Sequence, residues 1–335
     1  MNEIYPFSAI VGQNEMKQAV ILSAIDPSIG GVLVFGDRGT GKSTAVRALG
    51  SLLPKISVVE NCPFNCEKIN KKCPHCKNKK VEKLKKISTP VIDLPLGVTE
   101  DRVLGSLDIE IALLEGKKSF EAGLLASANR GFLYIDEVNL LDDHIVDLLL
   151  DVSASGENLI ERDGISIRHE SKFVLIGSGN PEEGELRPQL LDRFGLSVEV
   201  LSPKIIEERI EVIKRRNDFE INKEEFLKFW LKEDEKIRKK ILKAKRNYKS
   251  VVFNDEILKN CANLCLNLGA DGLRGELTLI RSIKALAAFQ GSREAKNEHL
   301  KVIAPSALRH RLRRDPLDEA GTTIRVEKAL EKIFK

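Results

Sequence analysis

The feature that most constrains this chain is a glycine-rich motif in residues 36–43, GDRGTGKS, which matches the phosphate-loop pattern G-x4-G-K-[ST]. It follows an apolar run, residues 31–35 (GVLVF), and precedes residues 44–53, whose pattern predicts a helix. In this order, backbone N–H groups and the N-terminus of the helix can surround phosphate oxygens. The residues that we expect to bind a nucleotide here are Gly36, Asp37, Arg38, Gly39, Thr40, Gly41, Lys42, Ser43 and Thr44.

The motif and a second apolar run together predict the groups that hydrolyse the nucleotide. Lys42 is expected to reach the β- and γ-phosphates, and the hydroxyl of Ser43 to ligate Mg²⁺. The second run, residues 132–135 (FLYI), ends in Asp136 and Glu137. We expect Asp136 to hold Mg²⁺ directly or through a water, and Glu137 to act as general base toward the attacking water.

A third apolar run, residues 173–176 (FVLI), is followed by the polar segment that contains Asn180. In open α/β sheets, ligands bind at the carboxyl ends of the strands. Asn180 is therefore predicted to orient the attacking water or to contact the γ-phosphate.

The order of the elements predicts two domains. In residues 1–202, apolar runs alternate with helical stretches, which predicts an α/β domain with a parallel sheet covered by helices. In residues 203–335 the strand signals largely stop, and amphipathic stretches predict a helical linker and an all-α domain. Two insertions stand out in the first domain: a Cys- and Lys-rich segment at 61–86, and residues 157–170, where an Asp-Gly pair predicts a β-hairpin.

Composition narrows the class of protein further. The chain has 335 residues, a formal charge of only +4, no apolar run long enough to span a membrane and no signal-peptide pattern, so we expect a soluble, cytoplasmic protein. Basic runs at 68–86 and 236–249 lack interleaved aromatic residues, which argues against nucleic acid as a partner. A third run, 309–314, is a candidate docking segment for a partner or a neighbouring subunit.

Four of the six cysteines are closely spaced. They form a C-x3-C pair and a C-x2-C pair, a ligand set that suits a tetrahedral Zn²⁺ ion. Zinc bound by four sulfur atoms would be structural, because no coordination position stays open for catalysis. Reduced, redox-sensitive thiols and an inert loop remain the alternatives. The residues concerned are Cys62, Cys66, Cys73 and Cys76.

Longer strings of the sequence resemble a known family. The phosphate loop, the acidic strand end and the asparagine strand end resemble an AAA+ ATPase, a P-loop NTPase with a parallel sheet and a helical second domain. Nearly the whole chain is similar to the I subunits of magnesium chelatase. The strings that carry this resemblance are PFSAIVGQNEMKQAV (6–20), YIDEVNLLDDHIVDLLLDV (134–152), GSGNPEEGELRPQLLDRFGL (177–196), DGLRGELTLIRSIKALAA (271–288) and ALRHRLRRDPLD (307–318).

The resemblance implies roles that spacing alone does not indicate. Arg193 matches the arginine finger, which reaches the ATP of a neighbouring subunit, and Arg274 matches the sensor 2 arginine of the helical domain. Asp192 matches a position at the subunit interface, and Val11 lies in a segment that resembles the one beside adenine. An arginine finger implies a ring of identical subunits, which we expect to be hexameric.

The resemblance also implies an activity and partners. It implies an Mg²⁺-dependent ATPase motor that pairs with a D subunit and drives a porphyrin-binding H subunit to insert Mg²⁺ into protoporphyrin IX. Three alternatives remain open: the motor of a related chelatase that inserts cobalt, an AAA+ ATPase that acts on nucleic acid, and a scaffold that binds nucleotide without hydrolysing it.

Overall fold

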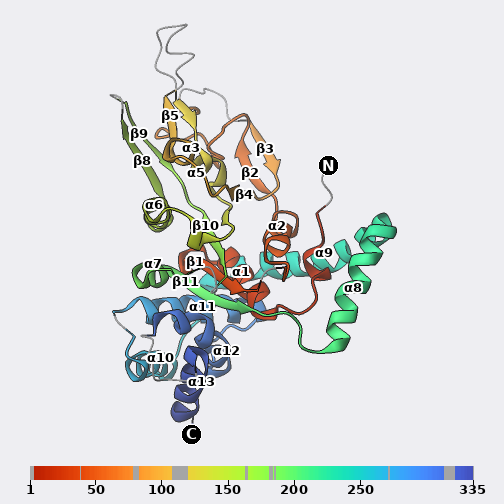
Figure 1. Ribbon diagram of the computed structural model, residues 1–335. Helices are drawn as coiled ribbons and strands as arrows, with labels where there is room; N and C mark the ends of the chain where they lie inside the picture. The colour runs from red at the N-terminus through yellow and green to blue at the C-terminus, as the bar shows by residue number, and fades with distance from the viewer. Residues whose placement is uncertain are drawn as a thin grey trace, which may run out of the picture.

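The computed structural model describes residues 4–37, 39–77, 83–107, 120–162, 165–180, 184, 186–270, 272–312 and 321–334. A five-stranded sheet forms its centre, in the order β11-β1-β10-β7-β4 with all neighbours parallel (Figure 1). The strands are β1 (Gly31–Gly36), β4 (Val91–Leu94), β7 (Phe132–Ile135), β10 (Val174–Gly179) and β11 (Phe194–Val200). The predicted parallel α/β sheet is confirmed, and each of the three apolar runs forms one of its strands.

Helices cover both faces of this sheet because alternate strand residues point to opposite sides. On one face, Val32 and Val34 join a core with helices of the first and the last part of the chain. On the other face, Leu33 and Leu133 pack in a second core. The first face is covered by α1 (Asn14–Ile25), α2 (Lys42–Leu52) and α11 (Arg274–Gln290), and the second by α3 (Glu100–Leu104), α5 (Leu124–Ala128) and α6 (Asp143–Ser155).

Three small antiparallel sheets are added beyond the main sheet (Figure 1). They pair β2 (Ile56–Val59) with β3 (Leu84–Ile87), β5 (Gly105–Leu107) with β6 (Phe120–Ala122), and β8 (Glu157–Arg162) with β9 (Ile165–Glu170). The last pair confirms the hairpin predicted for 157–170, whose turn at 163–164 lies outside the described residues. The strands β2 and β3 frame the cysteine-rich insertion.

Residues after 203 are helical, as the sequence predicts. Their helices are α8 (Ile206–Ile221), α9 (Lys223–Asn247), α10 (Asp255–Leu268), α11, α12 (Asn297–Leu308) and α13 (Gly321–Ile333). One hydrophobic cluster runs without a break from the sheet face into α10–α13. The domain boundary at 202/203 therefore stays a prediction, because no separate core marks it.

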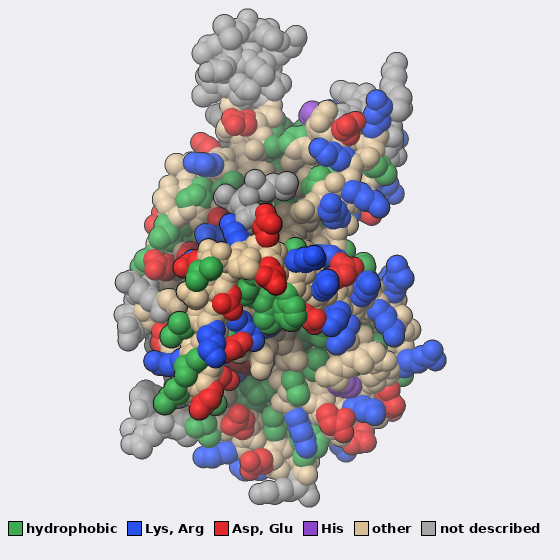
Figure 2. Space-filling model, turned by 90° about the vertical axis from the view of Figure 1, so that its right-hand side faces the viewer, with side chains coloured by type: hydrophobic (Ala, Val, Ile, Leu, Met, Phe, Trp, Pro, Cys, Tyr) green, Lys and Arg blue, Asp and Glu red, His purple; other side chains and the backbone are tan. Residues whose placement is uncertain are grey.

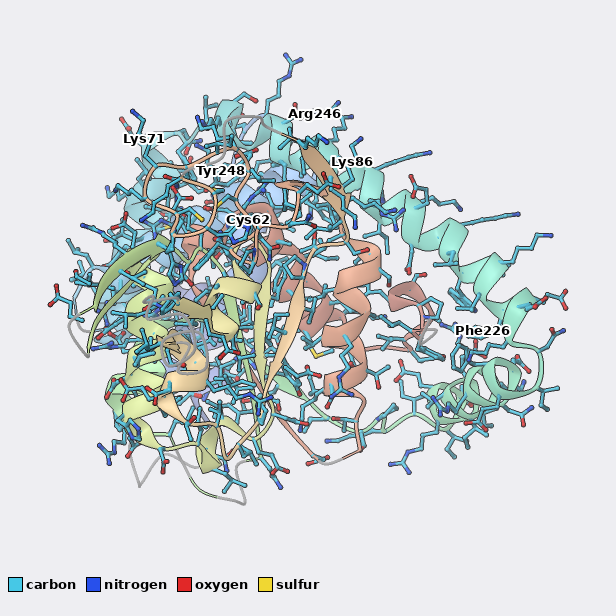
Figure 3. All side chains as sticks on the ribbon, turned by 90° about the horizontal axis from the view of Figure 1, so that it is seen from above. Cys62, Lys71, Lys86, Phe226, Arg246 and Tyr248 are labelled. Carbon is cyan, nitrogen blue, oxygen red and sulfur yellow. The ribbon has the colours of Figure 1, made fainter. Side chains whose placement is uncertain are left out.

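Short helical turns connect these elements. They are η1 (Phe7–Ala9), η2 (Pro27–Ile29), η3 (Val138–Leu140), α7 (Pro188–Arg193), η5 (Tyr248–Ser250) and η6 (Arg309–Arg311). Figure 3 shows Phe226 at one end of the long helix α9, and Arg246 and Tyr248 at the other. The hydroxyl of Tyr248 donates to the carboxylate of Asp26, which ties this end of α9 to the α/β part.

The surface carries mixed charge. Figure 2 shows the side of the molecule on which α8 protrudes. Lys and Arg side chains gather along one edge of this view, and over the rest of it basic and acidic side chains are mixed. Helix α8 contains no fully buried residue. In the described part of the chain, no helix combines the length and the apolar character needed to cross a bilayer.

Candidate active site

The phosphate loop joins β1 to α2 in a conformation that its glycines allow. Gly41 precedes the first helical residue with a φ of 80°, in the left-handed region that glycine tolerates best. At Gly36 a Cβ atom would lie 1.9 Å from the carbonyl oxygen of Val200, so a larger residue does not fit. Arg38 lies outside the described residues.

Lys42 lies over the loop. Its ammonium group donates to the carbonyl oxygens of Gly36 and Asp37, at 3.0 Å from the latter. The loop, Lys42 and the carboxyl ends of β7 and β10 enclose a cavity of about 420 Å³. The lining residues are Gly39, Thr40, Gly41, Lys42, Ser43, Thr44, Asp136, Glu137, Ser178, Gly179 and Asn180. The structure thus brings residues 39–44 of the predicted loop, both carboxylates and Asn180 around one cavity, whereas Gly36 and Asp37 do not line it.

Asp136 is held by three hydroxyl groups. Its Oδ1 accepts from Ser178 at 2.5 Å and from Tyr134 at 2.8 Å, and its Oδ2 lies 3.3 Å from the hydroxyl of Ser43. A carboxylate and a hydroxyl are hard oxygen donors of the kind that Mg²⁺ prefers, and both line the cavity. The pair therefore fits the Mg²⁺ of a bound nucleotide.

The same hydroxyls set the charge of Asp136. Partial burial would raise the pKa of this carboxyl, but hydrogen bonds from Ser178, Tyr134 and Ser43 outweigh it, so the pKa lies below its usual value. Burial raises the pKa of Tyr134 to about 12, so this hydroxyl stays protonated and able to donate. Asp136 is consequently ionised at neutral pH, as a metal ligand must be.

Sequence reasoning missed Tyr134 and Ser178, although a signal was present. Tyr134 precedes Asp136 by two residues, so the alternation of a strand places both side chains on one face. Tyr134 pairs with Ile176 in the neighbouring strand, so Ser178, two residues further on, lies opposite Asp136. A register assignment for β7 and β10 would have found both residues.

Glu137 has an unusual backbone conformation for its residue type. Its φ of 56° is left-handed, and its N–H donates to the hydroxyl of Ser178 at 3.2 Å. Asn180 is 8% exposed and lines the same cavity. The backbone turn directs the end of β7 toward the phosphate loop, where a carboxylate and an amide can act on one water.

A second cavity, of about 280 Å³, shares residues 39–41 and Thr44 with the first. Val11 lines it, together with apolar and aromatic side chains from the N-terminal segment and from α8. A partly apolar cavity next to a phosphate site suits a nucleobase. Sequence reasoning missed Tyr5, Val212 and Arg216 here, and no local signal indicates that α8 returns to this site.

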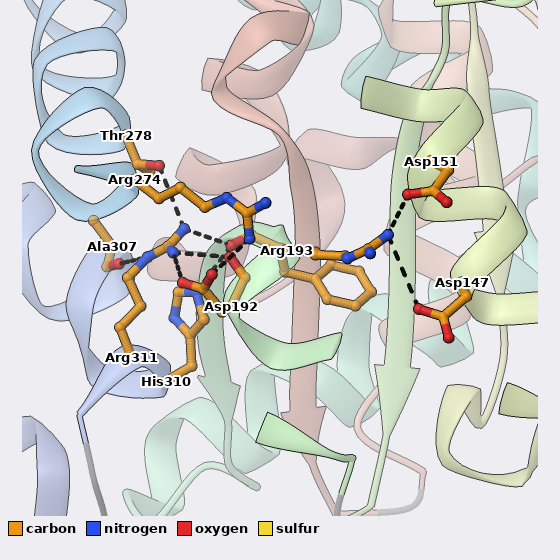
Figure 4. A network of polar contacts seen from close by, with 10 residues as sticks. Asp147, Asp151, Asp192, Arg193, Arg274, Thr278, Ala307, His310 and Arg311 are labelled. Atoms are coloured by element: carbon orange, nitrogen blue, oxygen red, sulfur yellow. Dashed lines mark hydrogen bonds and ion pairs between the residues drawn. The ribbon is translucent and has the colours of Figure 1, made fainter. Parts of the chain in front are cut away.

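Arg193 and Arg274 lie in a separate network around α7 (Figure 4). Arg193 pairs with Asp151 and lies 3.9 Å from a carboxylate oxygen of Asp147, both on α6. Arg274 donates to Asp192 at 2.6 Å. Among the described residues that line the phosphate cavity, neither arginine is present.

Arg311 completes this network from the buried side. Its side chain is 5% exposed, pairs with the carboxylate of Asp192 and donates to the carbonyl oxygens of Asp192 and Phe194 at 2.8 Å each. Burial lowers the pKa of His310 to about 3, so its neutral ring donates to Phe194. Arg309 is also buried and pairs with Glu15. The prediction that residues 309–314 dock a partner or a neighbouring subunit is therefore wrong for Arg309 and Arg311. Residues 313–314 lie outside the described residues.

The four clustered cysteines converge in the loop between β2 and β3. All four are buried, and their sulfur atoms lie within 4.8 Å of one another. Hydrogen bonds from the thiols of Cys66 and Cys73 lower the pKa of Cys62, and the same hydrogen bonds with Cys62 raise the pKa of Cys66 and of Cys73. Figure 3 shows Cys62 inside the loop and Lys71 at its outer rim. The other two cysteines, Cys261 and Cys265, are buried in α10 and belong to the hydrophobic core.

Comparisons with known proteins agree with this geometry. Residues 79–194 match the AAA domain of the dynein-related subfamily, and residues 258–333 match an AAA lid domain. The chain is 60% identical to the magnesium-chelatase 38 kDa subunit of Cereibacter sphaeroides, over the full length of both chains. The chain belongs to the family of magnesium-chelatase 38 kDa subunits.

Other members of this family give the same result. The 38 kDa subunit of Rhodobacter capsulatus is 60% identical and aligns over 98% of this chain and 94% of its own length. Among solved structures, a chain from a cryo-electron-microscopy study of the complex between subunits BchI and BchD of magnesium chelatase is 56% identical. It has a TM-score of 0.57 and aligns over 98% of this chain and 99% of that chain.

Family membership confirms the resemblance found in the sequence. The chain is an AAA+ ATPase subunit of magnesium chelatase, an enzyme of chlorophyll synthesis, with an AAA domain and a helical lid. An AAA ATPase acts on ATP with Mg²⁺, and the cavities around the phosphate loop match both in the type of groups that line them.

Proposed function

We propose that copies of this chain form a six-membered ring and hydrolyse Mg²⁺-ATP in sites shared by neighbours. The observation that carries the proposal is the separation of the two halves of the chemistry. The phosphate loop, Asp136 and Glu137 line one cavity, whereas Arg193 is held by carboxylates of α6 and does not line it. A guanidinium presented elsewhere on the same chain can act on the ATP of the next copy.

Each side chain then has one task. Lys42 and the loop amides hold the β- and γ-phosphates, and Ser43 and Asp136 hold Mg²⁺. Glu137 takes the proton of the attacking water, which Asn180 orients. Val11 contacts the base. Arg193 of the next copy stabilises the transition state, and Arg274 reports the phosphate state to the lid. The loop residues that cradle the phosphates are Gly36, Asp37, Arg38, Gly39, Thr40, Gly41 and Thr44.

The proposed work of the ring is magnesium insertion into protoporphyrin IX. The relative solved with BchD supports a D subunit as partner. We propose that a porphyrin-binding H subunit carries the insertion site and that this chain only supplies the free energy of hydrolysis. Mg²⁺ loses its water ligands reluctantly, so coupling to ATP is physically reasonable. Residues 1–202 form the proposed motor domain, and 203–335 the linker and lid.

A second metal belongs to the proposal. We propose a structural Zn²⁺ at Cys62, Cys66, Cys73 and Cys76, supported by their mutual approach within 4.8 Å and by their burial. Redox-sensitive thiols remain the alternative. In protein that is prepared under reducing conditions without added zinc, a zinc site predicts bound zinc, and redox-sensitive thiols predict none.

A mixing experiment tests the shared site. Lys42→Ala and Arg193→Ala variants are each expected to be inactive, but an equal mixture that co-assembles should regain about a quarter of the wild-type rate per chain. Half of the cradles are then intact, and half of those face an intact Arg193. The control mixes the double variant with either single variant and should regain nothing. No recovery in co-assembled rings would refute the shared site.

A further inference from the structure

The four cysteines have the dimensions of a metal site. The sulfur atoms of Cys62 and Cys73 lie 3.7 Å apart. Zinc–sulfur bonds of about 2.3 Å in a tetrahedron put two sulfurs about 3.8 Å apart. A disulfide would bring them to about 2.05 Å. Cysteines that ligate a cluster of several iron atoms stand further apart than four ligands of one ion, so the spacing points to a single ion.

Backbone amides support charged sulfur at this place. The N–H groups of Cys76 and Asn70 point at sulfur atoms of the cluster, at 3.4 Å from Cys73 and Cys76 respectively. Such outer donors are typical of metal-bound thiolates, because they stabilise the negative charge and orient the ligands.

The apolar core around the described part of the loop is small. The hydrophobic cluster around it consists of the four cysteines with Val59, Phe64 and Ala126, and Phe120 and Ala122 pack at its edge. A core of this size rarely stabilises a fold alone, and small folds of this kind commonly contain a metal or a disulfide. The described cysteines are all free thiols, so a disulfide does not supply the stability.

The same loop contacts three elements that are distant in sequence. Asn65 donates to the carbonyl oxygen of Ser127 in α5, and Asn129 donates to that of Phe64, both at 2.8 Å. The ring of Phe64 stacks on Phe120 of β6 at 6.3 Å and meets His169 of β9 edge-on at 4.8 Å. Phe64 lies between the first two cysteines, so its position depends directly on theirs.

The loop also reaches β8. Lys72, next to Cys73, pairs with Glu157 at 3.2 Å, and Glu157 pairs in turn with Arg168 of β9. Exposed ion pairs of this kind add little stability. The buried ring contacts of Phe64 are therefore the stronger link between the loop and the two strand pairs.

We infer that one Zn²⁺ ion, bound by the four thiolates, holds residues 62–76 as a clamp that positions the β5–β6 and β8–β9 insertions against α5. The inference rests on the zinc site of the proposed function and adds the task of that metal. The phosphate cavity contains no residue of the clamp, so the ion should not affect nucleotide binding.

The first experiment measures metal. Elemental analysis of protein prepared without added metal should find about one zinc per chain, and Co²⁺ substitution should give the visible spectrum of a tetrahedral thiolate site. Absence of metal, or iron in place of zinc, would overturn the inference.

The second experiment measures the clamp. Amide exchange in β6 and β9 should be at least about tenfold faster in Cys73→Ala than in wild type, because the strands lose their packing partner. The matched control is Cys261→Ala, which removes a buried cysteine of α10 and should leave β6 and β9 protected. Nucleotide binding should be unchanged in both variants.

If Cys73→Ala does not fold, removal of zinc from the wild-type protein by a chelator tests the same prediction. Wild-type protein stripped of zinc should show the same faster exchange, and added Zn²⁺ should reverse it. Loss of zinc without faster exchange would refute the clamp. ATP hydrolysis of the wild-type ring is measured separately, so a failure of the ATPase proposal would be seen as such.

Discussion

In the phosphate-binding cleft, polar groups from three strand ends face one cavity, whereas in the network around α7 each arginine is held by a carboxylate of its own chain. Among the described residues, the cleft brings together the phosphate loop, Asp136, Glu137 and Asn180, and no arginine lines it. The network has guanidinium groups but no phosphate site. The proposed function treats the two regions as complementary parts of one site that neighbouring copies share.

The three arginines of the network differ in how far their side chains are exposed to solvent. The side chains of Arg193 and Arg274 are 34% and 58% exposed, and that of Arg311 is 5% exposed. Ion pairs at exposed positions contribute only about 0–1 kcal/mol, so the first two arginines can exchange a carboxylate for a phosphate at little cost. Arg311 cannot, because it is buried among backbone carbonyl groups. The comparison separates arginines that can move from one that supports the structure.

The largest expected effect is that of Arg193→Ala. Removal of an arginine finger should lower the hydrolysis rate about 1,000-fold while ATP binding remains. Hydrolysis and nucleotide affinity are measured on the assembled protein, with Arg246→Ala, an exposed arginine of α9, as the control. An unchanged rate would show that Arg193 takes no part in hydrolysis. The network around α7 would then not complement the phosphate-binding cleft.

Glu137→Gln should have the second-largest effect. We expect the rate of hydrolysis to fall about 100-fold, because an amide cannot take the proton of the attacking water. ATP binding should persist, since the loop and Asp136 are intact. A variant that loses binding as well would show that Glu137 organises the loop rather than the water.

Arg311→Leu should act on stability. Loss of the buried guanidinium removes the donor to the carbonyl oxygen of Asp192 and one of the two donors to that of Phe194. We expect the free energy of unfolding to fall by about 2 kcal/mol. This is less than for a fully buried pair because Asp192 is 37% exposed. In urea denaturation, Arg274→Leu should change stability by less than about 1 kcal/mol. Equal effects would remove the distinction between the two arginines.

The smallest expected effect concerns pH. Hydroxyl donors hold the pKa of Asp136 below its usual value, so the carboxylate stays ionised as the pH falls. Tyr134→Phe removes one donor and should raise that pKa. As the pH is lowered, Mg²⁺ affinity should then begin to weaken at a higher pH than in wild type. Titration of Mg²⁺-dependent nucleotide binding from about pH 6 down to about pH 3, across the usual aspartate pKa of about 3.9, measures the shift. No shift would indicate that Ser178 and Ser43 set the pKa of Asp136 without Tyr134.

Local patterns predicted most of the fold and of the cleft. Each apolar run became a strand of the sheet because burial on both faces requires continuous apolar residues. Asp136, Glu137 and Asn180 could be placed near the loop because parallel strands bring their carboxyl ends to one edge. Ser178 was missed because the register between β7 and β10 is not visible locally. Tyr134 could have been found, because alternation within one strand places it on the same face as Asp136.

The sequence by itself determined the strand–loop–helix unit, the residues at the strand ends and the family. These depend on chain neighbours and on a repeating backbone geometry. Only the tertiary structure decided that Arg193 meets α6, that Arg311 is buried against Asp192, and that Phe64 meets β6 and β9. Such contacts join segments far apart in the chain, and which side chains meet there depends on how whole elements pack.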